Sequence, residues 1–460
     1  MNPSSQRRSE NKSASVSGHR PDKQAEEDLW SIYKAERLVW SEKMLRTLAR
    51  GVKGGKWFSL IDKVYSERTL SLAWQKVKSN AGACGVDGIT IEAFGKDSES
   101  RLLVVKEHLK QGSYQPKPVK RVQIPKLGSK ETRPLGIPTV TDRVVQQAVR
   151  MVLEPIYEHR FADQSYGFRP GRSCHDALRR VNGQLESGHT HVVDIDIKGY
   201  FDTIDHERLL KLLKEDVSDG RILEIIEGFL KAGVLEEGVY EISETGTPQG
   251  GVISPLLSNI YLDELDHLME SRGYAMTRYA DDMIVLCKTP EEANRALETV
   301  REWLTGVGLK LHPEKTRVVN MQEANNHFDF LGYRFKGLKS GRRLLKLVRP
   351  KSAKKLRESI RIKTKRNNGH SMKTIIEQIN PILRGWFEYY KQVYRGQQRE
   401  LDGWIRMRLR SIYRRRHRKR GRDRGSDHQE WPNKHFAELG LFSLETAQVE
   451  AIGLRNGVKH

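Results

Sequence analysis

The sequence predicts an α+β fold, in which a body of helices and antiparallel strands precedes an all-helical C-terminal region. Two observations predict the strands: β-branched residues alternate with acidic ones at 191–206, and two apolar runs flank an acidic turn at 273–288. The third observation lies beyond Pro350, where apolar residues recur every three or four positions. With 460 residues, the chain is long enough for roughly two to four domains with their own cores.

The chain is strongly basic. It carries 81 lysines and arginines against 59 acidic residues, which gives a formal net charge of +22. A surplus of this size favours a polyanionic partner, and nucleic acid is the commonest one. A basic surface without a partner is the weaker interpretation, because the charge is concentrated rather than spread.

Cysteine usage and hydropathy limit the class of protein. The three cysteines, Cys84, Cys174 and Cys287, form no C-x-x-C pair, so neither a disulfide framework nor a zinc finger is predicted. This usage is typical of a reducing compartment, and we expect a cytoplasmic protein. No apolar run approaches the length of a membrane span, and the N-terminus lacks the apolar segment of a secretory signal. We therefore expect no membrane partner.

The N-terminal part is predicted to be helical after a disordered tail. Residues 1–22 are rich in serine, arginine and lysine, a composition typical of an unstructured segment. Apolar residues then recur at helical spacing, which predicts a helical extension over 23–79. A turn punctuated by glycines leads into a further helix at 80–94.

A basic hairpin is predicted at 117–143, with its turn at 128–129. Its cationic residues are Lys120, Arg121, Lys126, Lys130 and Arg133. Such a set of donors suits phosphate binding, although a solvated charged hairpin is an equally good interpretation in isolation. A helix at 142–157 and a loop rich in arginine, proline and glycine at 165–172 follow.

One strand with two unlike faces is predicted at 191–206, in the run H-V-V-D-I-D-I-K-G-Y-F-D-T-I-D-H. Its β-branched residues share one face, which places Asp194 and Asp196 on the other. Two carboxylates on one face are costly to bury without a cation. The alternative is a half-exposed edge strand whose polar side chains point to solvent.

A glycine-containing loop followed by the start of a helix is predicted at 247–259, in the run T-P-Q-G-G-V-I-S-P-L-L-S-N. Gly250 and Gly251 leave the backbone open to close approach by a ligand. Ser254 and Pro255 supply a helix cap and a proline at the first helical position.

The hairpin at 273–288 is expected to carry Asp281 and Asp282 at its turn, because adjacent aspartates depress strand propensity. At a turn the two carboxylates can lean toward one point and share a divalent cation, and without a cation they repel each other. For these residues alone, an ordinary polar turn is the better interpretation. Asp196 on a neighbouring strand reverses that preference. A helix at 290–306 and short strands at 309–311, 315–319 and 328–335 are expected to complete the sheet region.

Three amphipathic helices are predicted beyond Pro350: one around 353–365, one over 375–390 with a kink at Pro381, and one over 401–412. The last continues into the basic run S-I-Y-R-R-R-H-R-K-R-G-R-D-R-G, which favours contact with an RNA backbone over a solvated tail.

In this order the motifs resemble the reverse transcriptases encoded by bacterial group II introns, which are also called intron maturases. The resemblance runs from about residue 80 to residue 444. The motifs that carry it are G-V-D-G (85–88), I-P-K…R-P-L-G-I-P (124–138), S-Y-G-F-R-P-G-R (165–172), D-I-K-G-Y-F-D (196–202), T-P-Q-G-G-V-I-S-P-L-L-S-N (247–259), Y-A-D-D (279–282), L-H-P-E-K-T (311–316) and F-L-G-Y-R-F (330–335).

The resemblance implies a right-hand polymerase. Fingers are expected over 80–180, a palm with an antiparallel sheet and the catalytic site over 181–345, and an all-helical thumb or X domain over 346–425. Residues 426–460 are expected to form a C-terminal tail that binds nucleic acid. Many relatives carry an H-N-H endonuclease with paired cysteines, which this sequence lacks. We therefore expect no second-strand cleavage of DNA by this chain.

The resemblance also implies roles for single residues. Asp196, Asp281 and Asp282 correspond to the catalytic triad that holds two Mg²⁺ ions, with the carbonyl of Ile197 as a further ligand. Asp194 does not match the catalytic position and is interpreted as structural.

Further assignments concern the substrates. The residues expected to bind the nucleotide are Lys126 and Arg133 on the triphosphate, Phe201 beneath the deoxyribose, and Gln249 and Gly250 along the pocket. The residues expected to contact RNA are Arg169, Arg172, Lys315, Arg414, Arg415, Arg416 and Arg418.

The implied activity is RNA-directed DNA synthesis by two-metal chemistry, in which one ion activates the primer 3′-hydroxyl and the other neutralises the departing pyrophosphate. The implied partners are an intron RNA template, a DNA primer or target, and dNTPs. Splicing and retrohoming of the intron would be assisted by the same chain. Two alternatives stay open: an RNA-binding maturase with little polymerase activity, which the intact aspartates disfavour, and a related reverse transcriptase used in antiviral defence.

Overall fold

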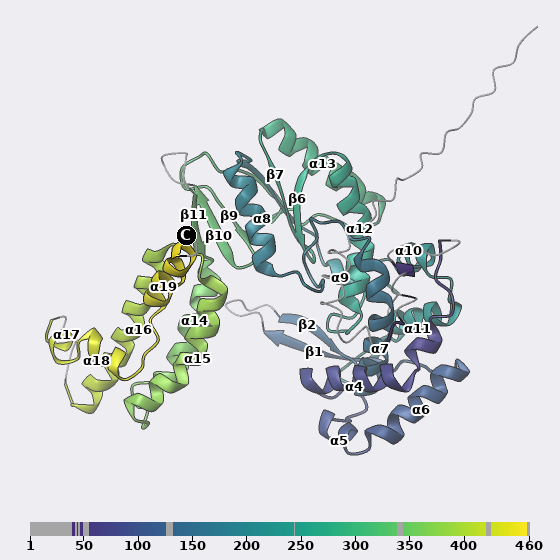
Figure 1. The fold of residues 1–460 in the computed structure, drawn as a ribbon, viewed down its shortest axis with the longest axis horizontal. Coiled ribbons are helices and arrows are strands. Elements are labelled where there is room, and N and C mark those ends of the chain that lie inside the picture. The colour runs from purple at the N-terminus through teal and green to yellow at the C-terminus, as the bar shows by residue number, and fades with distance from the viewer. Residues whose placement is uncertain are drawn as a thin grey trace, which may run out of the picture.

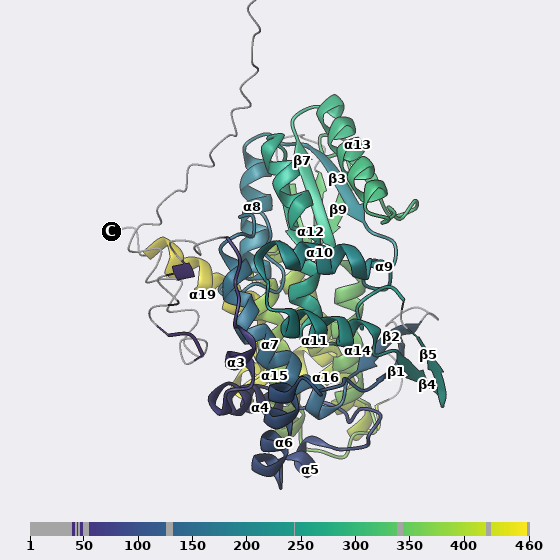
Figure 2. The same cartoon turned by 90° about the vertical axis from the view of Figure 1, so that its right-hand side faces the viewer.

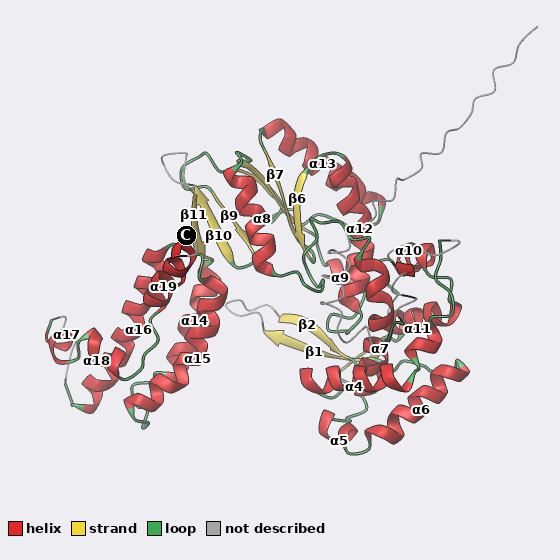
Figure 3. Ribbon diagram, in the orientation of Figure 1, coloured by secondary structure: helices red, strands yellow, loops and turns green. Residues whose placement is uncertain are grey.

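The computed structural model describes residues 39–41, 44, 47–48, 55–125, 132–242, 244–337, 344–419 and 425–457. The predicted tail at 1–22 and Lys126 lie outside these ranges. Within them the predicted α+β fold is confirmed, because helices surround separate small sheets and a helical region follows (Figure 3).

Helices dominate the first part of the structure: α3 (Ile61–Val64), α4 (Glu67–Asn80), α5 (Ile91–Gly95), α6 (Ser98–Gln111) and α7 (Val140–Glu158). Helix α7 is the centre of this group, and nearly all of its side chains are buried. Thr139 caps its first turn by accepting a hydrogen bond from the backbone N–H of Asp142. Because α3 and α4 pack against α7 in one apolar core, residues 61–79 of the predicted N-terminal extension are continuous with the part that follows.

The predicted basic hairpin is present as β1 (Val119–Pro125) and β2 (Thr132–Ile137), which pair antiparallel. Strand β1 also pairs in parallel with β4 (Val234–Glu236), and β4 pairs with β5 (Val239–Glu241). Figure 2 shows the β4–β5 hairpin projecting beside β1 and β2. This sheet, in the order β2-β1-β4-β5, therefore joins segments from both sides of the predicted boundary at 180/181.

A second four-stranded sheet has the order β6-β7-β3-β8. Its strands are β3 (His191–Asp196), β6 (Ala275–Tyr279), β7 (Asp282–Cys287) and β8 (Arg317–Asn320). Helices α12 (Ser254–Ser271) and α13 (Pro290–Gly306) share an apolar core with one face of this sheet. Helix α8 (Cys174–Glu186) packs on the other face. Figure 1 shows this layered arrangement, with α8 and α13 on either side of the strands.

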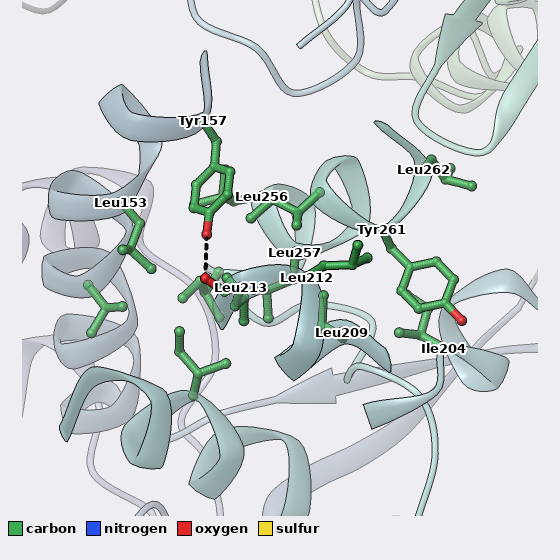
Figure 4. Packing of buried hydrophobic residues seen from close by; sticks show 14 of the residues in the cluster. Leu153, Tyr157, Ile204, Leu209, Leu212, Leu213, Leu256, Leu257, Tyr261 and Leu262 are labelled. Carbon is green, nitrogen blue, oxygen red and sulfur yellow. Dashed lines mark hydrogen bonds between the residues drawn. The ribbon is translucent and has the colours of Figure 1, made fainter. Parts of the chain in front are cut away.

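Short helices connect the two sheets: α9 (Tyr200–Thr203), α10 (His206–Asp216) and α11 (Gly220–Lys231). Figure 4 shows the apolar contacts through which α7, α10 and α12 meet. There the hydroxyl of Tyr157 on α7 donates a hydrogen bond to the carbonyl of Leu213 on α10, at 3.3 Å. Leu256 and Leu257 on α12 lie in the same cluster, which also contains residues of β3, β6 and β7, so one continuous core joins the first helices to the β6-β7-β3-β8 sheet.

The run at 328–335, predicted as one strand, is a hairpin, and the prediction is wrong there. Strands β9 (His327–Phe330) and β10 (Tyr333–Gly337) pair antiparallel, and β10 also pairs with β11 (Leu344–Val348). Leu331 and Gly332 form the turn with φ values of 48° and 80°. Glycine adopts this left-handed backbone without a steric cost, and Leu331 accompanies it at the two-residue connection.

The C-terminal part is helical, as predicted: α14 (Pro350–Lys363), α15 (Met372–Tyr390), α16 (Arg395–Arg416), α17 (Ser426–Glu430), α18 (Asn433–Glu438) and α19 (Leu444–Gly457). Helix α15 continues through Pro381. Trp431, Phe436 and Leu444 share an apolar core with α14, α15 and α16. Residues 431–451 therefore contribute to the core of the helical domain, and the expected binding of nucleic acid by 426–460 stays a prediction. No helix in the described ranges is long and apolar enough to span a membrane.

Candidate active site

Two of the three predicted catalytic aspartates face each other across a strand pair. Strands β3 and β7 run antiparallel in a register that places Asp196 directly opposite Asp282. Directly opposed residues project from the same face of a sheet, with Cα atoms roughly 4.5–5.5 Å apart. The intervening residues Ile195 and Met283 point to the other face, into the core beneath α12 and α13. The alternating pattern of both strands therefore places the carboxylates on one side.

Asp281 lies in the connection that joins β6 to β7. Tyr279 pairs with Asp282, so Ala280 and Asp281 form a two-residue turn. Ala280 has a φ of 59°, in the left-handed region that glycine favours. Both aspartates were predicted to lie at the turn, but Asp282 is the first residue of β7. Asp281 therefore lies next to the Asp196–Asp282 pair, but it belongs to the turn and not to a strand.

The environment of Asp282 disfavours its charged form. Desolvation by the surrounding chain, followed by repulsion from Asp194 and Asp281, raises the pKa of Asp282 to about 7, although part of its side chain stays accessible to solvent. A hydrogen bond from the backbone of Leu331 and the charge of Arg349 act in the opposite direction. The repulsive contributions show an excess of negative charge at this point of the sheet, which a cation would relieve.

Two basic residues lie at the carboxylates of β3. The Nζ atom of Lys315 is 3.2 Å from Oδ1 and 3.4 Å from Oδ2 of Asp196. Arg317 on β8 donates from Nε to Oδ2 of Asp194 at 3.3 Å. Asp194 thus has a side-chain partner within the sheet, in keeping with its structural interpretation. Lys315 was assigned to RNA contact, and the structure places it beside the predicted catalytic carboxylate.

The residues present fit a hard divalent cation. Carboxylate and backbone carbonyl oxygens are the ligands that Mg²⁺ prefers, and three aspartates supply them here. Ile197 lies directly after β3, where Lys198 N–H donates to Lys310 O at 2.9 Å and His312 N–H donates to Asp196 O at 2.8 Å. Across the described ranges, however, no three His, Cys, Asp or Glu side chains are gathered closely enough to enclose a metal. The Lys315 ammonium group supplies positive charge at Asp196 in this arrangement.

Two residues predicted to bind the nucleotide line one cavity. Phe201 and Gln249 both border a cavity of about 540 Å³ between the loop at 244–249 and strand β1. The backbone N–H of Thr247 donates to the carbonyl of Phe201 at 2.7 Å, which holds this loop against α9. Arg133 lies on β2, paired with Ile124.

At Gly250 the missing side chain allows close approach by another strand of the protein, whereas the sequence predicted close approach by a ligand. Its φ is +116°, and a Cβ there would lie 2.3 Å from the carbonyl oxygen of Gly136 on β2. The backbone N–H of Gly136 donates to Gln249 O at 2.7 Å. The absent side chain of Gly250 therefore makes room for a strand of the protein itself. A Cβ on Gly251 would lie 2.5 Å from the hydroxyl of Ser254.

Two arginines of the loop before α8 are used inside the protein. The guanidinium of Arg169 is buried and donates to Glu158 Oε1 at 2.9 Å, Ala162 O at 2.7 Å, Ser165 O at 3.0 Å and Glu158 O at 3.1 Å. Arg172 donates to the carbonyl and the carboxylate of Asp163 at 2.6 and 2.7 Å. These placements speak against the predicted RNA contact for Arg169, because its donors face protein oxygens.

The basic tract at the end of α16 divides into internal and exposed residues. Arg414 pairs with Asp427 at 2.7 Å, and their side chains are only 11% and 8% exposed. Arg416 donates to the carbonyl oxygens of Asn368 and His370. Arg415, Arg416 and Arg418 are exposed, so their charges face solvent, whereas Arg414 is nearly buried.

A buried polar cluster beside the catalytic turn was missed from the sequence. Arg278 on β6 and Asp266 on α12 form an ion pair whose side chains are both fully buried. Asn259 on α12 accepts a hydrogen bond from Arg278 and donates to Gly167 O at 2.8 Å. The available signal was an arginine in the centre of an otherwise buried strand, A-M-T-R-Y.

Comparison with known proteins supports the resemblance seen in the motifs. The model of the reverse transcriptase (RNA-dependent DNA polymerase) family matches residues 124–335. The model of the group II intron maturase-specific domain matches residues 353–431. The two matched segments correspond to the sheet-containing part and the helical C-terminal part of the structure.

Three relatives show the range of similarity. The group II intron-encoded protein LtrA of Lactococcus lactis subsp. cremoris is 48% identical over 220 residues, 48% of this chain and 36% of LtrA. Protein YkfC of Escherichia coli is 36% identical over 292 residues, 54% of this chain and 75% of YkfC. An uncharacterized 91 kDa protein in the cob intron of Schizosaccharomyces pombe is 30% identical, over 70% of this chain and 49% of that protein. The match to LtrA thus spans about a third of that protein.

Proposed function

Because the chain belongs to the reverse transcriptases encoded by group II introns, we propose that it is an RNA-directed DNA polymerase that also binds a group II intron RNA and assists its splicing. The observation that supports the polymerase most directly is the pairing of Asp196 with Asp282 on adjacent strands, with Asp281 at the turn between β6 and β7. Residues from two segments about eighty positions apart are thus brought to neighbouring ends of the inner strands β3 and β7.

In this proposal Asp196, Asp281 and Asp282 hold two Mg²⁺ ions, and the carbonyl of Ile197 adds a ligand. When bound, such ions activate the primer hydroxyl and neutralise charge on the leaving pyrophosphate. The protein contributes by positioning its reactants, which is the main source of catalysis in phosphoryl transfer. Lys315, whose ammonium group lies at Asp196, would compete with a cation for this carboxylate.

The nucleotide is proposed to occupy the cavity bordered by Phe201 and Gln249. The backbone of Phe201 is held by the hydrogen bond that its carbonyl accepts from Thr247, and its largely buried side chain borders the cavity. Lys126 and Arg133 are proposed to bind the triphosphate, and of these Arg133 lies on β2. The close backbone contact between Gly250 and Gly136 fixes the β1–β2 hairpin relative to Gln249.

The helical C-terminal domain is proposed to bind the intron RNA. This domain corresponds to the thumb and X domain, and residues 426–457 belong to it as well. Its exposed Arg415 and Arg418 are the proposed phosphate contacts of the basic tract. Contacts of this kind are independent of sequence and weaken as the salt concentration rises.

Primer extension tests the polymerase. The purified chain, an RNA template, a DNA primer, dNTPs and Mg²⁺ should give extended DNA, and the double variant Asp281→Ala plus Asp282→Ala should not. A DNA template of the same sequence serves as the comparison. Absent extension by the wild-type chain, or unchanged extension by the double variant, would refute the proposal.

A splicing assay tests the maturase part separately. An RNA that carries the group II intron flanking the coding sequence should splice faster at low Mg²⁺ when the chain is added. The double aspartate variant should retain this effect, because binding by the helical domain does not use the catalytic carboxylates. Without such an intron beside the coding sequence, a different biological use of the polymerase, such as antiviral DNA synthesis, becomes the better proposal.

A further inference from the structure

We propose that Arg278 is a positioning residue of the active site: together with Asp266 and Asn259 it holds the strained turn that presents Asp281 and Asp282 to the divalent cations. This inference rests on the proposed polymerase function. It concerns how the metal-binding turn is built, and Arg278 itself touches neither substrate nor metal.

All the donor groups of Arg278 that face the cluster are used. Nε donates to Asp266 Oδ1 at 2.8 Å and to Oδ2 at 3.0 Å, and Nη2 donates to Oδ2 as well. Nη1 donates to Asn259 Oδ1 at 2.9 Å and to the carbonyl oxygen of Ala280 at 3.0 Å. One guanidinium group thus connects α12 to the peptide that joins Ala280 to Asp281.

That peptide belongs to a turn under strain. Ala280 has a φ of 59°, a conformation that an L-residue with a side chain adopts at a cost of about 1–2 kcal/mol. Strained backbone persists only where its surroundings determine it, and the hydrogen bond from Arg278 to the Ala280 carbonyl is such a determinant. The orientation of this carbonyl sets the direction in which Asp281 follows.

A third segment packs against the same turn. A Cβ on Gly167 would lie 2.2 Å from the backbone nitrogen of Ala280, so this loop touches the turn directly. Asn259 Nδ2 donates to Gly167 O at 2.8 Å, and Tyr166 N–H donates to Arg278 O at 2.9 Å. The loop at 164–167, helix α12 and strand β6 are therefore joined at Arg278 and Asn259.

Stability alone does not account for a buried ion pair at this position. Arg278 and Asp266 are both fully buried, and desolvating two charges costs several kcal/mol, which their attraction only offsets when the geometry is good. Apolar residues of similar volume commonly give equal or greater stability. A planar guanidinium adds what an apolar side chain lacks: fixed directions for hydrogen bonds to three groups at once.

The substitution Arg278→Lys tests this role, because an ammonium group retains the charge opposite Asp266 but lacks the planar fork. Metal binding is measured directly, by the EPR signal of free Mn²⁺ titrated with protein. We expect an affinity about 10- to 100-fold lower than in the wild type, the range typical for residues that orient metal ligands. In single-nucleotide primer extension, kcat should fall by a similar factor, while KM for the dNTP should change less than about threefold, because the nucleotide pocket is untouched.

A second variant decides the matter if Arg278→Lys does not fold. Asn259→Ala removes the acceptor of Arg278 Nη1 on α12 and the donor to Gly167 O, so Mn²⁺ affinity should fall although Arg278 itself is retained. Arg410→Lys is the matched control. Arg410 is buried in the helical domain, where it donates to Trp431 O at 2.9 Å and Asn433 Oδ1 at 2.8 Å. This control should lower stability without changing Mn²⁺ affinity.

The outcomes separate the two proposals. Wild-type affinity and kcat in both Arg278→Lys and Asn259→Ala would overturn the positioning role. A wild-type chain that binds Mn²⁺ but never extends a primer would refute the proposed polymerase, and the Mn²⁺ titrations would still decide the role of Arg278. Equal losses of Mn²⁺ affinity in Arg278→Lys and Arg410→Lys would show a general effect of stability and would also overturn the inference.

Discussion

Gly250, in the loop before α12, lies backbone to backbone against Gly136 on strand β2. A Cβ on Gly250 would be 2.3 Å from the carbonyl oxygen of Gly136, and the N–H of Gly136 donates to Gln249 O at 2.7 Å. The hairpin that carries Arg133 and the loop that carries Gln249 are thus held in one fixed relation. Two sides of the proposed nucleotide pocket depend on this single contact.

The first prediction concerns this contact. Gly250→Ala forces a methyl group into the Gly136 carbonyl at a φ of +116°, so it should lower the free energy of unfolding by about 2–4 kcal/mol. The hairpin should also move away from Gln249, and KM for the dNTP should rise about tenfold or more, since small displacements of positioning groups are costly. Chemical denaturation and steady-state primer extension measure the two effects.

Gly183→Ala provides the control. Gly183 lies in α8, and a Cβ there meets no atom within 4 Å. Alanine is the better helix former, so this variant should gain about 0.5–1 kcal/mol with KM unchanged. A KM for Gly250→Ala equal to that of the wild type would contradict the coupling of hairpin and loop.

The second prediction concerns Asp282 and pH. Its pKa of about 7 in the folded chain exceeds the ordinary value of about 3.9, so the folded state binds the proton more tightly. This contribution to stability is fully present below about pH 4 and is lost as the pH rises through 7. Asp282→Asn should therefore raise the unfolding free energy at pH 8, by about 1 kcal/mol after allowance for solvent at a partly exposed group, and leave it unchanged near pH 4.

Mg²⁺ gives an independent check of the same group. The ion requires the carboxylate form, so it should stabilise the wild type more at pH 8 than at pH 5. Asp263, whose pKa is raised to about 6 mainly by burial, contributes a similar slope in both proteins. The difference between wild type and variant thus reports on Asp282, and identical pH profiles for the two would contradict the prediction.

The third prediction concerns Lys315. Its ammonium group lies 3.2 Å from Asp196 Oδ1 and competes with a cation for this carboxylate. Lys315→Met should raise Mn²⁺ affinity about fivefold, which corresponds to an attraction of about 1 kcal/mol between charges near 4 Å in water. The metal-free unfolding free energy should fall by less than about 1 kcal/mol, because the pair is exposed.

Lys434→Met, on the exposed side of α18 in the helical domain, is the matched control for the loss of one positive charge. It should leave Mn²⁺ affinity at the wild-type value. A lower Mn²⁺ affinity in Lys315→Met would show that Lys315 supports the metal site instead of competing for it.

The fourth prediction separates two neighbouring arginines. Arg415 is exposed, so Arg415→Ala should weaken binding of a group II intron RNA and reduce the slope of log affinity against log salt by about one, with the thermal midpoint unchanged. Arg414 is paired with Asp427 in the interior, so Arg414→Ala should lower the unfolding free energy by about 3–5 kcal/mol. Filter binding over a series of KCl concentrations and thermal unfolding measure these effects.

Affinity that does not depend on salt in the wild type would count against the basic tract as the RNA site. A loss of stability in Arg415→Ala comparable to that in Arg414→Ala would contradict the division between exposed and internal residues.

Local patterns in the sequence determined much of this protein. The alternation of residue types along β3 placed Asp196 on the opposite face from Ile195. The Asp281-Asp282 pair located the turn between β6 and β7. Helical periodicity located α15 and α16. Such features depend on spacing within one element, which a sequence shows directly. The motifs also identified the family, because their order along the chain is specific.

Only the tertiary structure decided which basic and glycine residues face inward. Arg169 was assigned to RNA, yet it is buried against Glu158, and Gly250 was assigned to a ligand, yet it makes room for Gly136. Arg278 was not singled out at all, although it joins three segments at the catalytic turn. A residue type states which hydrogen bonds a side chain can make, whereas the packing of segments distant in sequence determines whether protein oxygens or a nucleic acid accept them.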